Sequence, residues 1–249
     1  MPRMGAANSV ARAMKPSRTA RLASARGLTP ATRAACRFAS TMVRGDDAAA
    51  AGALRALRDA GAPRRVAEEC ALMLMLYGGF PAALEGLRTL NGVWPGRARR
   101  TREGGPARWR ARGNALCRRV YGDAYTRLLP AVRTLHPDLA EWMVEHGYGR
   151  VLSRPGLGAR ERELVTVAAL GALGWERQLV SHVLGAERVG ASRAAVGEAL
   201  AIGVGAGDAR ARAIAERTWE RASRAAGPTS RARPSRNTRA HTGRGRLAR

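Results

Sequence analysis

The apolar residues of this chain recur at helical spacing almost throughout, and this pattern constrains the fold more than any other feature. Isoleucine occurs only at Ile202 and Ile214, and no run alternates apolar and polar residues as a half-buried strand does. Alanine, leucine, arginine and glutamate, all good helix formers, dominate between the two termini. The sequence therefore predicts an all-α protein.

Glycine, proline and capping residues divide this pattern into segments of helical length. Gly61 follows one apolar segment, and Pro63 stands near the start of the next. A segment rich in glycine, proline and arginine, 95–114, is expected to be a loop. The expected helices cover about 46–60, 63–77, 81–92, 115–135, 137–147, 158–173, 175–189, 192–204 and 208–222.

The formal net charge of +25 is concentrated in the two ends of the chain and in the expected loop. Residues 1–45 and residues 221–249 each carry nine basic groups and no acid, and residues 95–119 carry nine arginines against one glutamate. The rest of the chain is close to neutral, so the charge forms no basic face on a folded domain. The tails contain one aromatic residue, Phe38, and no motif that reads bases, so we expect no specific nucleic-acid partner.

These differences in composition predict three parts. Residues 1–45 are predicted to be a disordered arginine-rich tail, with a transit peptide or a start site assigned too far upstream as alternatives. Residues 46–221 are predicted to form one all-α domain. Residues 222–249 lack apolar periodicity and are predicted to be a disordered basic tail.

The apolar runs and the cysteines exclude several classes of protein. No run approaches the roughly 18 apolar residues that a membrane span requires, so no membrane association is expected. The three cysteines, Cys36, Cys70 and Cys117, form neither a CxxC pair nor a metal-ligand spacing with the four histidines. We therefore expect free thiols, no metal site and a reducing compartment. That compartment is the cytoplasm, or an organelle if residues 1–45 are a transit peptide.

Two stretches of the chain share one layout, EECALMLMLYGGFPAALEGL (68–87) and RELVTVAALGALGWERQLVSHV (162–183). Each has a glutamate early on an apolar helix, then a short turn that contains glycine, then an amphipathic helix. They predict a duplicated helical hairpin whose apolar faces pack on each other. Apolar residues occupy more than one helix face in 72–76 and 164–173, and a chain of this size covers only part of that surface by itself. We therefore expect a homo-oligomer, a trimer or a hexamer.

The second hairpin contains the residues best suited to chemistry. Glu163 lies about ten residues before the expected turn and His182 about eight after it, so antiparallel helices would bring the two side chains level. Trp175, Gln178 and His182 share one helix face. A carboxylate beside an imidazole is a plausible acid–base pair, and a structural tie between two helices is the alternative. In the first hairpin Glu69 has no such partner, since Leu87 and Arg88 stand at the matching distance.

The stretch HGYGRVLSRPGLGARERELVTVAALGALGWERQLVSHVLGAERVGAS (146–192) resembles the carboxymuconolactone decarboxylase family, also called alkylhydroperoxidase-D-like. Segments 68–87 and 119–149 also fit longer members, so the resemblance covers roughly residues 50–205. It implies an all-α fold built on helical hairpins and small subunits assembled as trimers or hexamers.

The resemblance implies two chemistries, and the sequence fits one of them better. The peroxidase branch uses Glu-x11-Cys-x2-Cys-x3-His, a pattern that begins at Glu163 here and places Trp175, Gln178 and His182 at the last three positions. Both cysteines are missing, so no thiolate nucleophile is present and peroxidase activity is not expected. The decarboxylase branch lacks the cysteines and implies cofactor-free loss of CO2 from a small, anionic, unsaturated lactone acid.

The decarboxylase resemblance assigns roles to several side chains. His182 is expected to donate the proton, Glu163 to assist it or act as the base, and Gln178 to donate a neutral hydrogen bond. Candidates to bind the substrate are Tyr148, Arg150, Arg154, Arg162 and Trp175.

Each of these binding residues also has a structural interpretation. Arg162 stands beside Glu161 and Glu163, where a surface ion pair is the alternative to substrate binding. For Tyr148 and Arg154 the alternative is a structural role in turns, and Trp175 is expected to pack rather than to stack on a substrate. For His146 a cap or helix-dipole role is expected rather than catalysis. A non-catalytic oligomer that binds ligands or acts as a scaffold stays open as the second interpretation of the whole chain.

Overall fold

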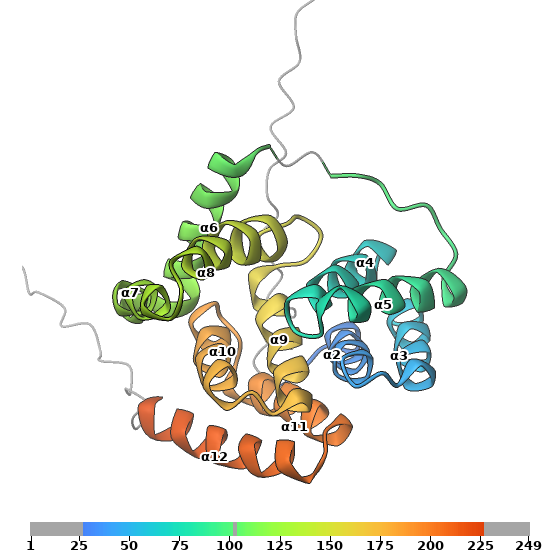
Figure 1. The fold of residues 1–249 in the computed structure, drawn as a ribbon. Coiled ribbons are helices and arrows are strands. Elements are labelled where there is room, and N and C mark those ends of the chain that lie inside the picture. The colour runs from blue at the N-terminus through green and yellow to red at the C-terminus, as the bar shows by residue number, and fades with distance from the viewer. Residues whose placement is uncertain (1–26, 102–103, 227–249) are drawn as a thin grey trace, which may run out of the picture.

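The computed structural model describes residues 27–101 and 104–226, and within these ranges the chain forms helices and no strand (Figure 1). The all-α prediction is confirmed. The first half contains the helices α2 (Pro30–Met42), α3 (Asp47–Asp59), α4 (Arg64–Met73), η1 (Leu74–Leu76), α5 (Gly79–Val93), α6 (Pro106–Tyr121) and η2 (Gly122–Ala124). The second contains α7 (Tyr125–Leu135), α8 (Pro137–Trp142), the π-helix η3 (Met143–Leu152), α9 (Ala159–Leu173), α10 (Glu176–Arg188), α11 (Arg193–Ala206) and α12 (Ala209–Ala226).

Helix α9 is the centre of the fold. Its residues from Arg162 to Ala172 are all buried, and α2, α10, α11 and α12 pack around it (Figure 1). A helix that is apolar on every side is stable only when neighbours cover every side. The charged residues of this buried stretch, Arg162 and Glu163, are therefore removed from water and need partners within the protein.

The predicted disordered tail at 1–45 is wrong from Pro30 onward. Pro30–Met42 is helix α2, in which Thr29 caps the first turn by accepting a hydrogen bond from the backbone N–H of Thr32. Phe38 is fully buried, and α2 packs on both α9 and α11. The arginines of α2 occupy one face, while small and apolar residues occupy the other. Because the whole stretch is rich in arginine, its composition does not reveal this apolar face. Residues 1–26 lie outside the described part of the chain.

Three further boundaries differ from the expectation. Helix α6 begins at Pro106, inside the expected 95–114 loop. The single helix expected at 115–135 is divided at Gly122, whose φ of 56° ends α6 and starts the short η2 turn. Helix α12 continues past residue 222 to Ala226, and Ala222 is buried, so the expected C-terminal tail starts too early. Residues 227–249 lie outside the described part.

Glycines allow α6 and η3 to cross at very close range. A Cβ atom added to Gly113 would lie 2.0 Å from the carbonyl oxygen of Val144, and one added to Gly149 would lie 2.0 Å from that of Trp109. Only glycine fits at both places. The helix expected at 137–147 continues beyond this crossing as η3, and π-helical segments are frequent at functional sites.

Within the described residues, no helix is both long and apolar enough to cross a lipid bilayer.

The buried position of α2 predicts a large loss of stability when its aromatic residue is truncated. Phe38→Ala should lower the free energy of unfolding by about 3–5 kcal/mol, because it leaves a cavity in the core. The matched control is Phe80→Ala, since Phe80 is 67% exposed and should cost less than about 1 kcal/mol. Urea unfolding of both variants measures the difference. Equal losses would show that α2 does not belong to the folded core.

Candidate functional site

The α9–α10 hairpin brings Glu163 and His182 into direct contact. Gly174 ends α9 in the left-handed conformation, with φ 68°, and its N–H donates to the carbonyl of Leu170. Helix α10 then runs back along α9, and His182 Nδ1 lies 2.8 Å from Glu163 Oε2. Glu163 is 2% exposed and His182 is 8% exposed. With Glu163 as a carboxylate, Nδ1 donates the hydrogen bond and Nε2 is the nitrogen left to act on a ligand.

Close packing around the carboxylate fixes this pair. A Cβ atom added to Gly185 would lie 2.9 Å from Glu163 Oε2 and 2.7 Å from a methyl carbon of Val120. The glycine at this position of α10 therefore makes room both for the carboxylate and for α6.

His182 lines a cavity of about 350 Å³ that lies between α10, η3 and the segment around Tyr77. Aliphatic and aromatic side chains make most of its wall, and imidazole, phenol and amide groups supply its polar atoms. The size suits a single small ring with its substituents. The cavity is lined by Leu76, Tyr77, Tyr121, Leu139, Trp142, Met143, His146, Gly147, Tyr148, Leu152, Leu170, Gln178 and His182.

Tyrosine hydroxyls surround the acid–base pair. The hydroxyl oxygens of Tyr121 and Tyr148 are 2.6 Å apart, and the ring of Tyr121 lies 6.5 Å from that of His182, centre to centre. The hydroxyl oxygen of Tyr77 lies 2.5 Å from that of Thr166, and the Thr166 hydroxyl donates a hydrogen bond to the carbonyl of Arg162. Burial raises the pKa of all three tyrosines above 10, with the Glu163 carboxylate contributing. These phenols are therefore neutral hydrogen-bonding groups at physiological pH.

The structure brings together part of the predicted site. His182, Gln178 and Tyr148 line the cavity, and Glu163 stands behind His182. Trp175 is 57% exposed and lines a separate hollow between the α9–α10 turn and α12, so it neither packs in the core nor reaches the cavity.

None of the three predicted arginines lines the cavity. Arg162 is buried and donates to Glu69 over 2.9 Å, so the interpretation as a surface ion pair with Glu161 or Glu163 is wrong. Arg154 also donates to Glu69, over 3.0 Å. Arg150 is exposed and its guanidinium lies 4.8 Å from the ring centre of Trp109.

Among the polar residues of the cavity wall, sequence reasoning missed the phenols of Tyr77 and Tyr121 and the imidazole of His146. Burial, with a smaller effect of Arg150, lowers the pKa of His146. A cap or dipole role was expected for His146 because it stands near the end of the expected helix. In the structure η3 continues past His146, which lines the cavity. The signal available for Tyr77 was its place at the turn of the first hairpin, and Tyr121 carried no distinguishing pattern.

The described residues offer no group of three or more histidine, cysteine or acidic side chains able to hold a metal ion. The cysteines are also poorly placed for redox chemistry, since Cys36, Cys70 and Cys117 are all buried. Burial raises the pKa of the Cys70 and Cys117 thiols to about 12 and raises that of Cys36 further. Each thiol is protonated at physiological pH and is a poor nucleophile.

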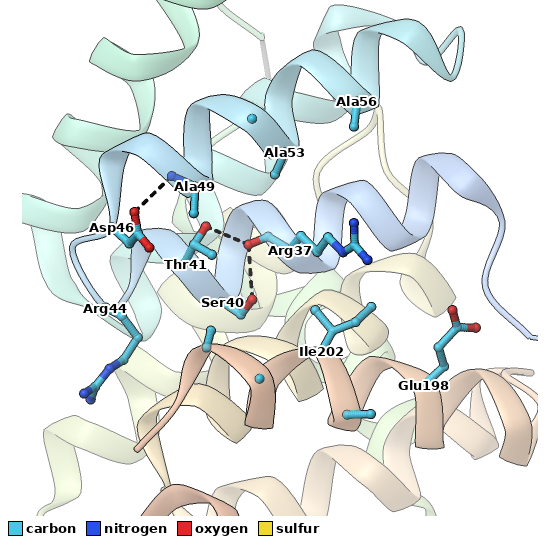
Figure 2. Close-up of a pocket in the computed structure, with 14 residues that line it drawn as sticks. Arg37, Ser40, Thr41, Arg44, Asp46, Ala49, Ala53, Ala56, Glu198 and Ile202 are labelled. Carbon is cyan, nitrogen blue, oxygen red and sulfur yellow. Dashed lines mark hydrogen bonds between the residues drawn. The ribbon is translucent and has the colours of Figure 1, made fainter. Parts of the chain in front are cut away.

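A larger hollow of about 770 Å³ lies between α2, α3 and α11 (Figure 2). Small residues such as Ala53 line much of it, and several of its polar groups are already engaged. Figure 2 shows the hydroxyls of Ser40 and Thr41 bonded to the carbonyl of Arg37, and Asp46 capping α3. This arrangement holds no acid–base pair, so the cavity beside His182 is the better candidate site.

The fold and the site define an all-α protein in which a helical hairpin holds a buried carboxylate–imidazole pair at the wall of a small cavity. Residues 137–218 match the model of the carboxymuconolactone decarboxylase family, and this segment contains α8 to α11 and most of α12. Over these residues the chain is similar to that family. No match was found among curated proteins.

The raised thiol pKa values predict that the native protein resists alkylation. Iodoacetamide at pH 8 should label none of the three cysteines of the folded protein within minutes, and all three in urea. Mass spectrometry of the intact chain counts the added groups. Rapid labelling of Cys70 or Cys117 without denaturant would contradict the burial of these thiols and reopen thiol chemistry.

Proposed function

We propose that this protein is a cofactor-free lyase that removes CO2 from a small, cyclic, unsaturated carboxylic acid by acid–base catalysis. The observation that supports this most is the contact of 2.8 Å between Glu163 and His182 at the wall of the cavity. The family match agrees with it, since the segment that carries the pair lies within residues 137–218.

The proposed reaction uses one proton and no redox partner. The bond between the ring carbon and the carboxylate breaks, and its electron pair spreads into the conjugated carbonyl of the substrate as CO2 leaves. His182 Nε2 then gives a proton to carbon, and Glu163 stabilises the imidazolium from the Nδ1 side. The Gln178 amide is available to stabilise the charge that develops on the carbonyl oxygen.

The polar groups of the cavity suggest how an anionic acid is held without an arginine. A phenol hydroxyl of the cavity wall offers a hydrogen bond to a carboxylate oxygen, which leaves His182 for the proton transfer and Gln178 for the carbonyl oxygen. The walls formed by Leu76, Trp142 and other apolar side chains exclude water, which strengthens those hydrogen bonds. The proposal therefore assigns Arg150, Arg154 and Arg162 no contact with the substrate.

We further propose that the protein is a homo-oligomer, a trimer or a hexamer. Leu139 and Trp142 line the cavity, and Trp142 is 64% exposed in the single chain. Large apolar residues exposed at the mouth of a site are typical of surfaces that another chain covers.

The proposed lyase activity predicts that His182 is essential. His182→Ala should lower kcat for a carboxymuconolactone-type substrate by about 100-fold or more, because the proton donor is lost. The matched control is His136→Ala, since His136 is exposed and caps α8. Loss of the lactone absorbance and release of CO2 measure the rate. Parent and His182→Ala rates that agree within twofold would exclude the assigned role.

If the parent protein binds such acids without turnover, the non-catalytic ligand-binding interpretation is correct instead. Equilibrium dialysis with the same acids separates these two results.

The oligomer proposal predicts a mass of three or six chains by multi-angle light scattering. Trp142→Glu should shift the protein toward smaller species, because a charge would be buried at the contact. A monodisperse monomer for the parent would contradict it.

A further inference from the structure

The cavity beside His182 has a second imidazole in its wall, that of His146. This side chain comes from η3, whereas His182 comes from α10. His146 is half-buried, and no hydrogen bond or ion pair joins its ring to another of the described residues. Glu163 holds one nitrogen of His182, while both ring nitrogens of His146 are left for a ligand.

The crossing of η3 with α6 places His146 beside the cavity. Gly149 lies further along η3, and a Cβ atom added to it would be 2.0 Å from the carbonyl oxygen of Trp109. Arg112 of α6 also donates to the carbonyl of Gly149, over 2.8 Å. These contacts anchor the backbone of η3 just beyond His146.

Most hydroxyl protons of the cavity wall are already used in hydrogen bonds within the protein. The Thr166 hydroxyl donates to the carbonyl of Arg162, so in its contact of 2.5 Å with Tyr77 the phenol must be the donor. In the contact of 2.6 Å between Tyr121 and Tyr148, one phenol donates to the other. The three phenols therefore keep one free proton between them.

A carboxylate has two oxygen atoms, and one phenol proton satisfies only one of them. In the proposed reaction His182 gives its proton to carbon, and Gln178 serves the carbonyl oxygen. The indole of Trp142 stands at the mouth of the cavity, where this residue is 64% exposed. The N–H of His146 is therefore available in the wall as the second donor.

The charge state of His146 suits the binding of a carboxylate that must leave. Burial lowers the pKa of His146, and the positive charge of Arg150 lowers it further, so the imidazole is neutral at physiological pH. A neutral donor orients a carboxylate but stabilises its negative charge less than a cation does. Because that charge moves into the ring as CO2 forms, a cation would stabilise the ground state more than the transition state.

We propose that His146 binds the carboxylate group of the substrate, with its N–H donating to one oxygen and the free phenol proton to the other. The inference rests on the proposed function, since it takes a small cyclic acid as the ligand of the cavity. It makes His146 a substrate-binding residue and leaves the proton transfer to His182. The substrate then lies with its carboxylate toward η3 and its ring toward α10.

Binding of 2-furoate, a small ring with one carboxylate, tests this role without turnover. Calorimetric titration of the full chain should show binding weakened about tenfold or more in His146→Leu, because a hydrogen bond to a charged group is lost. His146→Gln supplies an amide donor and should restore the affinity to within about threefold of the parent. The matched control is His136→Leu, which should change the affinity less than about twofold, since His136 is exposed and does not line this cavity.

Kinetics with a lactone acid separate the roles of His146 and His182. His146→Leu should raise KM about tenfold or more and leave kcat within about threefold, whereas His182→Ala lowers kcat. Binding of 2-furoate that depends on His146, without any release of CO2 from lactone acids, would refute the lyase proposal and support the role of His146.

An affinity of His146→Leu for 2-furoate within about twofold of the parent would overturn the inference. Equal weakening in His146→Leu and His146→Gln would overturn it too, because packing would then account for the loss, and so would a parent protein that binds no 2-furoate. If His146→Leu does not fold, the parent labelled with 15N-histidine replaces it. Ring-nitrogen resonances of His146 that saturating 2-furoate leaves unchanged would contradict the proposed contact.

Discussion

The burial of α9 from Arg162 to Ala172 governs the arrangement of charge in this protein. Arg162 and Glu163 are neighbours on a helix that is covered on all sides, so each needs its own partner within the protein. Arg162 pairs with Glu69 on one side, and Glu163 pairs with His182 on the other. Removal of one partner from a buried ion pair typically costs about 3–5 kcal/mol, so both contacts constrain how α9 sits among its neighbours.

The two hairpins use matching glutamates in different ways. Glu69 and Glu163 occupy corresponding places in the two stretches 68–87 and 162–183. Glu69 is surrounded by guanidinium groups, which stay charged and therefore serve structure. Glu163 faces an imidazole, the side chain that most often transfers protons in enzymes. Only the second hairpin thus combines the carboxylate with a group suited to proton transfer.

Local signals in the sequence were enough to predict the second hairpin. Gly174 marks the turn, and the spacing of Glu163 and His182 on either side follows from helix geometry. The Glu69–Arg162 pair joins residues 93 positions apart, and no local pattern predicts it. Tyr121 reaches the cavity only through tertiary packing, so no local pattern predicts its place there either. Helix α2 was not predicted because its apolar face is short and the stretch around it is rich in arginine.

The most direct test of the central claim is nitrogen NMR of the protein labelled with 15N-histidine, with His182→Gln used to assign the resonances. The account predicts a proton on Nδ1 of His182, held by Glu163, and a change at Nε2 when 2-furoate, a small ring with one carboxylate, is added. An Nδ1 without a proton would contradict the assigned pair. An Nε2 resonance that saturating 2-furoate leaves unchanged would contradict its access to the cavity.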